Sequence, residues 1–210
     1  MRVLTCHDNL LIAEGAVRLF ENALDVEGRS ARSWDSALQA LAEQDPGFDL
    51  LVADNYFSGH RVDALVRAAR QVGCGAQTLV LATNDSPIAR AVALSAGAAG
   101  YVAATADPQR IAAAAAGLFE GRTSFGFEDL DETSLRDVMP PLTRQESRVL
   151  VLLNRGLRFK QIALSLGISE ATVKGYARAV FNKLGVNSRA EAVYEARSQG
   201  LLEYLEMEPL

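Results

Sequence analysis

The chain has 210 residues, of which 49% are hydrophobic and 22% are charged, a composition typical of a globular protein with one or two domains. No apolar run approaches the length of about 18 residues that a membrane-spanning helix needs. The first residues also lack the long apolar stretch of a secretory signal. We therefore expect a cytoplasmic protein that does not enter a membrane.

The net charge of −5 is unevenly distributed along the sequence. Residues 1–120 hold no lysine and set nine arginines against fourteen acids, a balance of −5. Residues 142–197 set ten lysines and arginines against four acids, a balance of +6. A basic segment in an acidic chain indicates a local surface for binding a polyanion such as nucleic acid.

The two cysteines and two histidines have no metal-ligand spacing, which argues against a disulfide framework and against a metal site. Cys6 ends an apolar run, and we expect it to be a small buried residue. The sequence also offers no nucleophile–base pair and no phosphate-binding glycine loop. We therefore do not expect an enzyme.

The first 120 residues alternate between short apolar runs and helical patterns. Strand-like runs cover residues 2–6, 48–53, 78–82 and 100–103, and helical patterns cover 10–20, 62–72, 86–96 and 108–119. Two of these helices begin with a capping residue followed by proline, at Ser86-Pro87 and Asp107-Pro108. This alternation predicts an α/β doubly wound (βα)5 domain, with a parallel sheet covered by helices on both faces.

Residues 121–141 break the alternation. They hold five acids with little periodicity and close on Pro140-Pro141, which indicates a linker between two domains. The predicted organisation is therefore a first domain over residues 1–120, a linker over 121–141 and a second domain over 142–210.

The second domain shows helical patterns alone, over residues 143–156, 160–166, 169–184 and 189–199. Thr143 and Glu146 form a capping box at the start of the first helix. Gly167 marks a tight turn, and Ser169 caps the longest helix directly after it. Two helices joined by a short turn with glycine are typical of a helix-turn-helix. The sequence thus predicts an all-α four-helix domain.

The helix after Ser169 separates into two faces. An apolar stripe through Val173, Ala177 and Val180 is predicted to pack inward. Lys174 and Arg178 lie one turn apart on another face, where they can donate to guanine O6 and N7 in a major groove or to phosphates. Gly175 lies between them and lets the backbone approach the bases. Further DNA contacts, mostly to phosphates, are expected from Ser169, Thr172, Asn182, Lys160, Lys183 and Arg189.

Several motifs of this region closely resemble the LuxR-type helix-turn-helix of the NarL/FixJ response regulators. They are Leu142-Thr143-x-x-Glu146, Ile162-Ala163-x-x-Leu166-Gly167-Ile168-Ser169-x-x-Thr172-Val173-Lys174 and Lys183-Leu184-Gly185-Val186. The resemblance implies that the helix over 170–184 enters the major groove, with Lys174, Gly175 and Arg178 nearest the bases.

The same resemblance implies that the helix over 189–199 forms a dimer contact, for which Val193, Ala196 and Gly200 are candidates. Phe159 stands where the family usually has a small polar residue, and we expect it to cover the edge of the core. The acidic tail after Gly200 extends past the usual end of the family. It either lengthens the dimer helix or forms a loose tail.

Residues 1–120 resemble a CheY-like receiver domain. The resemblance places Asp54 at the phospho-accepting position and Asp8 at one of the two acids that hold Mg²⁺ beside it. Tyr101 matches the switch aromatic residue of the fifth strand. Gly59 matches the glycine of the loop after Asp54.

Three other receiver positions have changed. His7 replaces the first acid of the Mg²⁺ pair, Ala82 stands at the hydroxyl residue that ends the fourth strand, and Ala104 stands at the lysine after the fifth strand. Thr83 comes one residue late, where strand alternation predicts that its side chain points away from the site. Mg²⁺ prefers oxygen ligands, and phosphoryl transfer needs cations around the developing negative charge. The sequence therefore predicts a degenerate receiver, with no cofactor and no ordinary Mg²⁺-dependent phosphorylation.

Three functional hypotheses follow from these observations. The leading one is a homodimeric, sequence-specific transcription regulator that binds promoter DNA independently of ordinary phosphorylation and uses its first domain for dimerisation or ligand sensing. The second is an orthodox two-component regulator phosphorylated on Asp54 by a sensor kinase. The third is an anti-activator that forms a heterodimer with another regulator.

Overall fold

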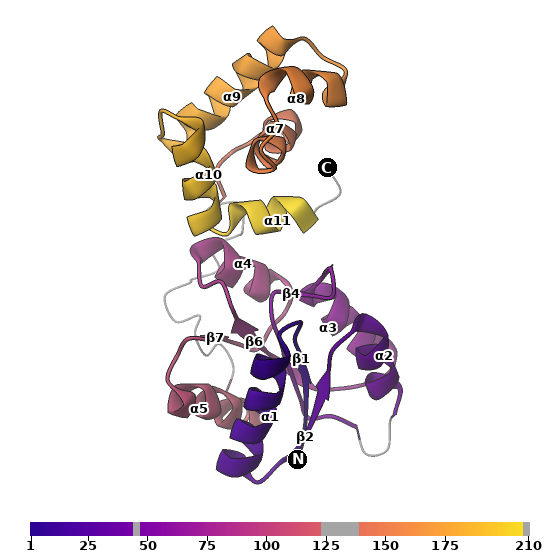
Figure 1. Ribbon diagram of the computed structural model, residues 1–210. Coiled ribbons are helices and arrows are strands. Elements are labelled where there is room, and N and C mark those ends of the chain that lie inside the picture. The colour runs from indigo at the N-terminus through magenta and orange to yellow at the C-terminus, as the bar shows by residue number, and fades with distance from the viewer. Residues whose placement is uncertain (44–46, 123–138, 208–210) are drawn as a thin grey trace. The chain divides into compact units, whose positions relative to one another are not determined.

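A computed structural model describes residues 1–43, 47–122 and 139–207 of the chain. These residues form two compact units, one built on a sheet and one wholly helical (Figure 1). The predicted linker over 121–141 lies largely outside the described residues, and its five acids lie there entirely. No helix of the described ranges is long and apolar enough to cross a bilayer.

The first unit contains a five-stranded sheet in the order β2-β1-β3-β6-β7. The strands are β1 (Arg2–Cys6), β2 (Glu27–Ala31), β3 (Leu50–Ala53), β6 (Gln77–Ala82) and β7 (Gly100–Ala103). All neighbouring pairs are parallel. The predicted doubly wound fold class is confirmed.

Helices cover both faces of this sheet (Figure 1). They are α1 (Leu10–Leu24), α2 (Trp34–Ala42), α3 (Val62–Gln71), α4 (Pro87–Ser95) and α5 (Pro108–Phe119). Leu50 and Val52 of β3 pack in one core with α1 and α5, whereas Leu51 and Ala53 pack in the other with α2, α3 and α4. Successive residues of a strand point to opposite faces, so a strand covered on both sides is apolar throughout.

Three features of this unit were not predicted from the sequence, and one of them is the helix α2. The edge strand β2 consists mostly of polar residues, and only its last residue, Ala31, is buried. A small antiparallel hairpin follows β3 and joins β4 (Tyr56–Phe57) to β5 (His60–Arg61). Its two-residue turn places Ser58 and Gly59 at φ +52° and +75°, the left-handed conformation that tight hairpin turns require.

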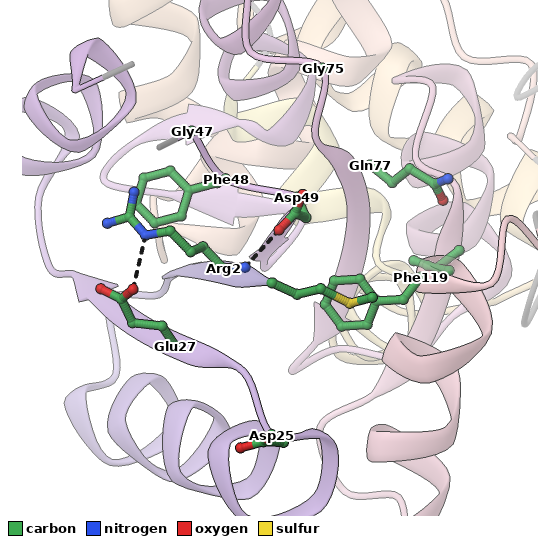
Figure 2. A pocket seen from close by; sticks show the side chains of 11 residues that line it. Arg2, Asp25, Glu27, Gly47, Phe48, Asp49, Gly75, Gln77 and Phe119 are labelled. Atoms are coloured by element: carbon green, nitrogen blue, oxygen red, sulfur yellow. Dashed lines mark hydrogen bonds and ion pairs between the residues drawn. The ribbon is translucent and has the colours of Figure 1, made fainter. Parts of the chain in front are cut away.

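A hollow of about 850 Å³ lies at the amino edge of the sheet, at the opposite ends of the strands from Asp54 (Figure 2). Arg2 spans one side of it, with its guanidinium carbon 4.7 Å from the centre of the Phe48 ring and Nε 3.4 Å from a Glu27 oxygen. The Arg2 backbone N–H donates to Asp49 at 2.7 Å. These contacts tie the starts of three strands together.

The second unit contains five helices among its described residues. They are α7 (Arg144–Asn154), α8 (Phe159–Leu166), α9 (Glu170–Leu184), α10 (Arg189–Ser198) and α11 (Leu201–Met207). The capping box of Thr143 and Glu146 is present, and the Ser169 hydroxyl accepts from the Thr172 backbone N–H at 3.0 Å. Gly167 ends α8 in the left-handed conformation. The predicted helix-turn-helix elements are confirmed.

The acidic tail behaves as neither of the predicted alternatives. Gly200 has φ +75°, which interrupts the helical conformation after α10, and the chain then starts the separate helix α11. This helix packs against α7 and α10. Glu206 accepts a hydrogen bond from the Asn154 amide at 3.1 Å and lies 4.0 Å from Arg155. The described helices therefore number one more than predicted, within the same all-α class.

Candidate DNA interface and receiver pocket

The helix α9 presents its predicted cationic face to solvent. Its apolar stripe, including Val173 and Ala177, is buried against α7 and α8. Because one side of the helix is fixed in this core, the opposite side faces outward. The predicted DNA-contacting residues that are exposed are Lys160, Ser169, Thr172, Lys174, Gly175, Arg178, Asn182 and Lys183. Phe159 packs against the edge of the same core, as predicted.

Lys174 has a partner on this face that the sequence reasoning missed. Its ammonium lies 2.8 Å from a carboxylate oxygen of Glu170, and both side chains are about half exposed. The hydrogen bond from Lys174 and the positive charges of Lys174 and Lys160 hold the pKa of Glu170 below its ordinary value. The i, i+4 spacing of an acid before a base is the signal that could have revealed this pair.

Two of the predicted phosphate-contacting residues have partners within the unit. The Lys183 ammonium donates to the Pro141 carbonyl at 2.8 Å and to the buried Glu146 carboxylate at 2.7 Å. The Arg189 guanidinium donates to the carbonyl of Leu153 in the last turn of α7 and to that of Leu157 beyond its end. Both cations thus bind oxygen atoms of the protein itself, and their contact with DNA phosphates stays a prediction.

Two of the three predicted dimer residues are inaccessible in the structure. Ala196 is fully buried and Gly200 is buried as well, whereas Val193 is half-buried. α10 packs against α7, α9 and α11, and its fully buried residues are Ala192 and Ala196. The assignment of Ala196 and Gly200 to a dimer contact is therefore corrected. Tyr194 on the same helix is 74% exposed.

The receiver pocket gathers side chains at the carboxyl ends of three strands. His7, Asp54 and Thr83 directly follow β1, β3 and β6. His7 is almost fully buried, and its Nε2 lies 3.6 Å from an Asp54 oxygen, while its Nδ1 accepts from the Asn9 backbone N–H at 2.9 Å. Nδ1 is thus unprotonated, and in the neutral ring Nε2 carries the hydrogen and faces the carboxylate.

Asp54 is engaged by several groups of the protein. One of its oxygens accepts the Asn55 backbone N–H at 2.7 Å, and the Thr83 hydroxyl donates to the other. Burial raises the pKa of Asp54, against the lowering effect of these hydrogen bonds and of His7. The expectation that Thr83 points away is wrong. β6 ends at Ala82, so the strict alternation of side chains does not extend to the next residue.

The switch aromatic residue Tyr101 is buried inside the first unit. Its hydroxyl donates to the Asn84 carbonyl at 3.2 Å, and the Arg90 guanidinium lies 5.6 Å from the centre of its ring. Burial, followed by the charge of Asp85, raises the pKa of the Tyr101 phenol. The inward position of this ring is therefore supported by groups other than the Thr83 hydroxyl.

The donor set beside Asp54 does not fit Mg²⁺. Both oxygens of Asp8 approach the Ser58 backbone N–H, at 2.9 and 3.2 Å, and His7 supplies nitrogen where the ion prefers oxygen. Ala82 and Ala104 supply no polar side chain, and Ala82 is buried. Over residues 1–43, 47–122 and 139–207, the structure brings no three His, Cys, Asp or Glu side chains into a metal-binding group.

Comparison with known proteins identifies relatives of both units. Residues 140–196 match the family of bacterial regulatory proteins of the luxR type. The transcriptional regulatory protein DesR of Bacillus subtilis is 27% identical over 91% of this chain and 92% of its own length. A probable transcriptional regulatory protein of Hyphomicrobium methylovorum, SgaR, is 39% identical over 48% of this chain and 47% of its own length.

A solved structure extends the similarity over nearly the whole chain. The response regulator ChrA, from a heme-sensing two-component system, is 30% identical over 95% of this chain and 98% of its own, with a TM-score of 0.52. Its coverage includes both the sheet unit and the helical unit. The chain therefore belongs to the response regulators with a LuxR-type helix-turn-helix, a family of DNA-binding transcription regulators.

Proposed function

We propose that this protein is a homodimeric regulator that binds a specific promoter sequence through α9, without Mg²⁺-dependent phosphorylation of Asp54. In this proposal residues 1–120 form a receiver-like module and residues 142–210 form the DNA-binding module, joined by a linker over 121–141. The single observation that carries the DNA-binding part is the exposed face of Lys174, Gly175 and Arg178 on a helix whose other side is fixed in a core.

The phosphorylation-independent part rests on the surroundings of Asp54. Its carboxylate is occupied by Thr83, Asn55 and His7, and the sequence holds no lysine before residue 160 to stabilise an acyl phosphate. Tyr101 already lies in the buried position that phosphorylation would be expected to favour. These observations favour a first module whose conformation does not wait for a phosphoryl group.

A phosphodonor experiment tests this part of the proposal. The full chain is incubated with a small-molecule phosphodonor and Mg²⁺, and its intact mass is measured beside that of an Asp54→Ala variant. We expect no stoichiometric gain of a phosphoryl group in either protein, because the site lacks a fixed cation and an oxygen-rich Mg²⁺ site. A variant with His7→Asp and Ala104→Lys restores both groups and serves as the matched comparison.

A stoichiometric gain in the wild type that is absent from Asp54→Ala would instead support the orthodox alternative, in which a sensor kinase phosphorylates Asp54. The burial of Asp54 and its hydrogen bonds favour regulation without phosphorylation over this orthodox alternative. A small ligand or a partner regulator is a further candidate input to the first module.

DNA binding is tested by selection from a random duplex library with the unphosphorylated full chain. We expect one enriched sequence with two half-sites, because a homodimer places two copies of α9 on the duplex. Affinity for that sequence should fall steeply as salt rises, since lysine and arginine contacts release counterions from DNA. Failure to enrich any sequence would favour the anti-activator hypothesis.

A further inference from the structure

The exposed face of α9 carries an acid beside its bases. Glu170, Lys174 and Arg178 follow one another at intervals of four residues, which places them in one row along the helix. Glu170 is the sole acid of this helix and the first residue of it. Its carboxylate oxygen and the Lys174 ammonium lie 2.8 Å apart, with side-chain exposures of 45% and 55%.

This acceptor and donor match the major-groove edge of a G·C pair. Guanine presents O6 and N7 acceptors, and cytosine presents its N4 amino donor. Guanine O6 and cytosine N4 are hydrogen bonded to each other, so they lie about 2.9 Å apart, close to the spacing of the two protein atoms. An A·T pair suits these two side chains less well. A carboxylate that accepts from adenine N6 lies beside adenine N7, whose lone pair repels it, and the thymine methyl group flanks the O4 acceptor.

A carboxylate at this position also discriminates by repulsion. The phosphates of DNA are negative, so Glu170 opposes every placement of α9 in which it has no base donor to meet. Interfaces commonly gain specificity through such unfavourable contacts with wrong partners. The positive charges of Arg178 on the same face and of Lys160 on α8 attract DNA of any sequence.

We propose that Glu170 determines specificity, by accepting a hydrogen bond from cytosine N4 of a G·C pair whose guanine is contacted by Lys174. This inference rests on the proposed function, since it requires α9 to lie in a major groove. The simpler alternative is that Glu170 only stabilises α9, through its pair with Lys174 and its place at the positive helix end. That alternative predicts a change in stability with an unchanged base preference.

The test compares Glu170→Ala and Glu170→Gln with wild type and with Glu203→Gln, an exposed acid of α11 whose loss changes the net charge equally. All four full-length proteins undergo selection from a random duplex library. Their affinities for the selected duplex and a scrambled duplex are then measured at fixed salt. Melting curves verify that each variant is folded, and the glutamine variant preserves side-chain size if alanine weakens the helix.

We expect wild type and Glu203→Gln to favour G·C by about tenfold at one position of each half-site. Glu170→Ala should lose this preference and bind scrambled DNA several-fold more tightly than Glu203→Gln does. Glu170→Gln should shift the same position toward A·T, because glutamine pairs with adenine N6 and N7.

Selection of the same base at every position by both Glu170 variants and wild type would overturn the inference while leaving the proposed function in place. Enrichment of no sequence by the wild type would overturn the proposed function, and this inference with it.

Discussion

A variant with Lys174→Glu and Arg178→Glu is expected to lose sequence-specific DNA binding. Both side chains are exposed, one turn apart on α9, and directed away from the core formed with α7 and α8. A guanine-directed contact is worth about 1–3 kcal/mol of discrimination, so loss of two predicts affinity lower by roughly 30-fold or more. Fluorescence anisotropy with the selected duplex at fixed salt measures this loss.

The matched control reverses Arg18 and Arg67 in the first unit. Both are exposed, at 76% and 63% of the side chain, and their replacement by glutamate changes the net charge by the same amount. We expect this control to retain specific binding and to weaken scrambled-DNA binding only slightly. Operator affinity equal to wild type in the Lys174/Arg178 variant would refute the assignment of this helix face to the major groove.

The second large effect is expected from Glu146→Gln in the helical unit. Glu146 is 6% exposed, and its carboxylate receives the Lys183 ammonium and the Thr143 backbone N–H, at 2.7 and 2.6 Å. Hydrogen bonds to charged groups contribute about 1.5–3 kcal/mol each. We expect the variant to lose about 2–3 kcal/mol of unfolding free energy at neutral pH, because Lys183 loses its buried anionic partner.

Far-ultraviolet circular dichroism follows helix loss during denaturation, and the fluorescence of Trp34, the single tryptophan, reports on the first unit alone. The part of the circular dichroism transition that comes from the helical unit should shift to lower denaturant concentration, while the Trp34 transition remains in place. A shift of both transitions by the same amount would contradict the assignment of this ion pair to the helical unit.

The ion pair of Glu146 and Lys183 should make the stability of the helical unit depend on pH. Burial acts to raise the pKa of Glu146, but the hydrogen bonds from Lys183 and Thr143 outweigh it, and the pKa lies below its ordinary 4.5. A carboxyl with a depressed pKa in the folded state stabilises that state above its ordinary pKa, and this contribution disappears as pH falls through the folded-state value. The unfolding free energies of wild type and Glu146→Gln should therefore differ at neutral pH and become equal in acid.

Local signals in the sequence were sufficient to predict most elements. Thr143 with Glu146, and Ser169, mark helix starts because a capping side chain bonds to backbone only two or three residues away. The buried strands were equally visible as apolar runs, whereas β2 was missed because an edge strand with polar residues has no such pattern. Helices and strands were predicted correctly where the residues that stabilise them lie close together in the sequence.

Long-range contacts account for what the sequence did not show at the candidate sites. Lys183 and Arg189 looked like free cations in the sequence, but their partners lie more than thirty residues away in the chain. Thr83 reaches Asp54 across the ends of two strands, which strand alternation does not describe. The sequence revealed the cationic face of α9 as a pattern, whereas the partners of Lys183 and Arg189 became visible only in the folded structure.

The break at Gly200 also bears on where this module can be cut. A chain ending at Gln199, the end of the last helix expected from the sequence, would omit α11 and the hydrogen bond of Glu206 to Asn154. Surfaces of α7 and α10 that α11 contacts would then meet water. Helix α11 is thus part of the packed helical unit, and we expect an excised DNA-binding fragment to need it.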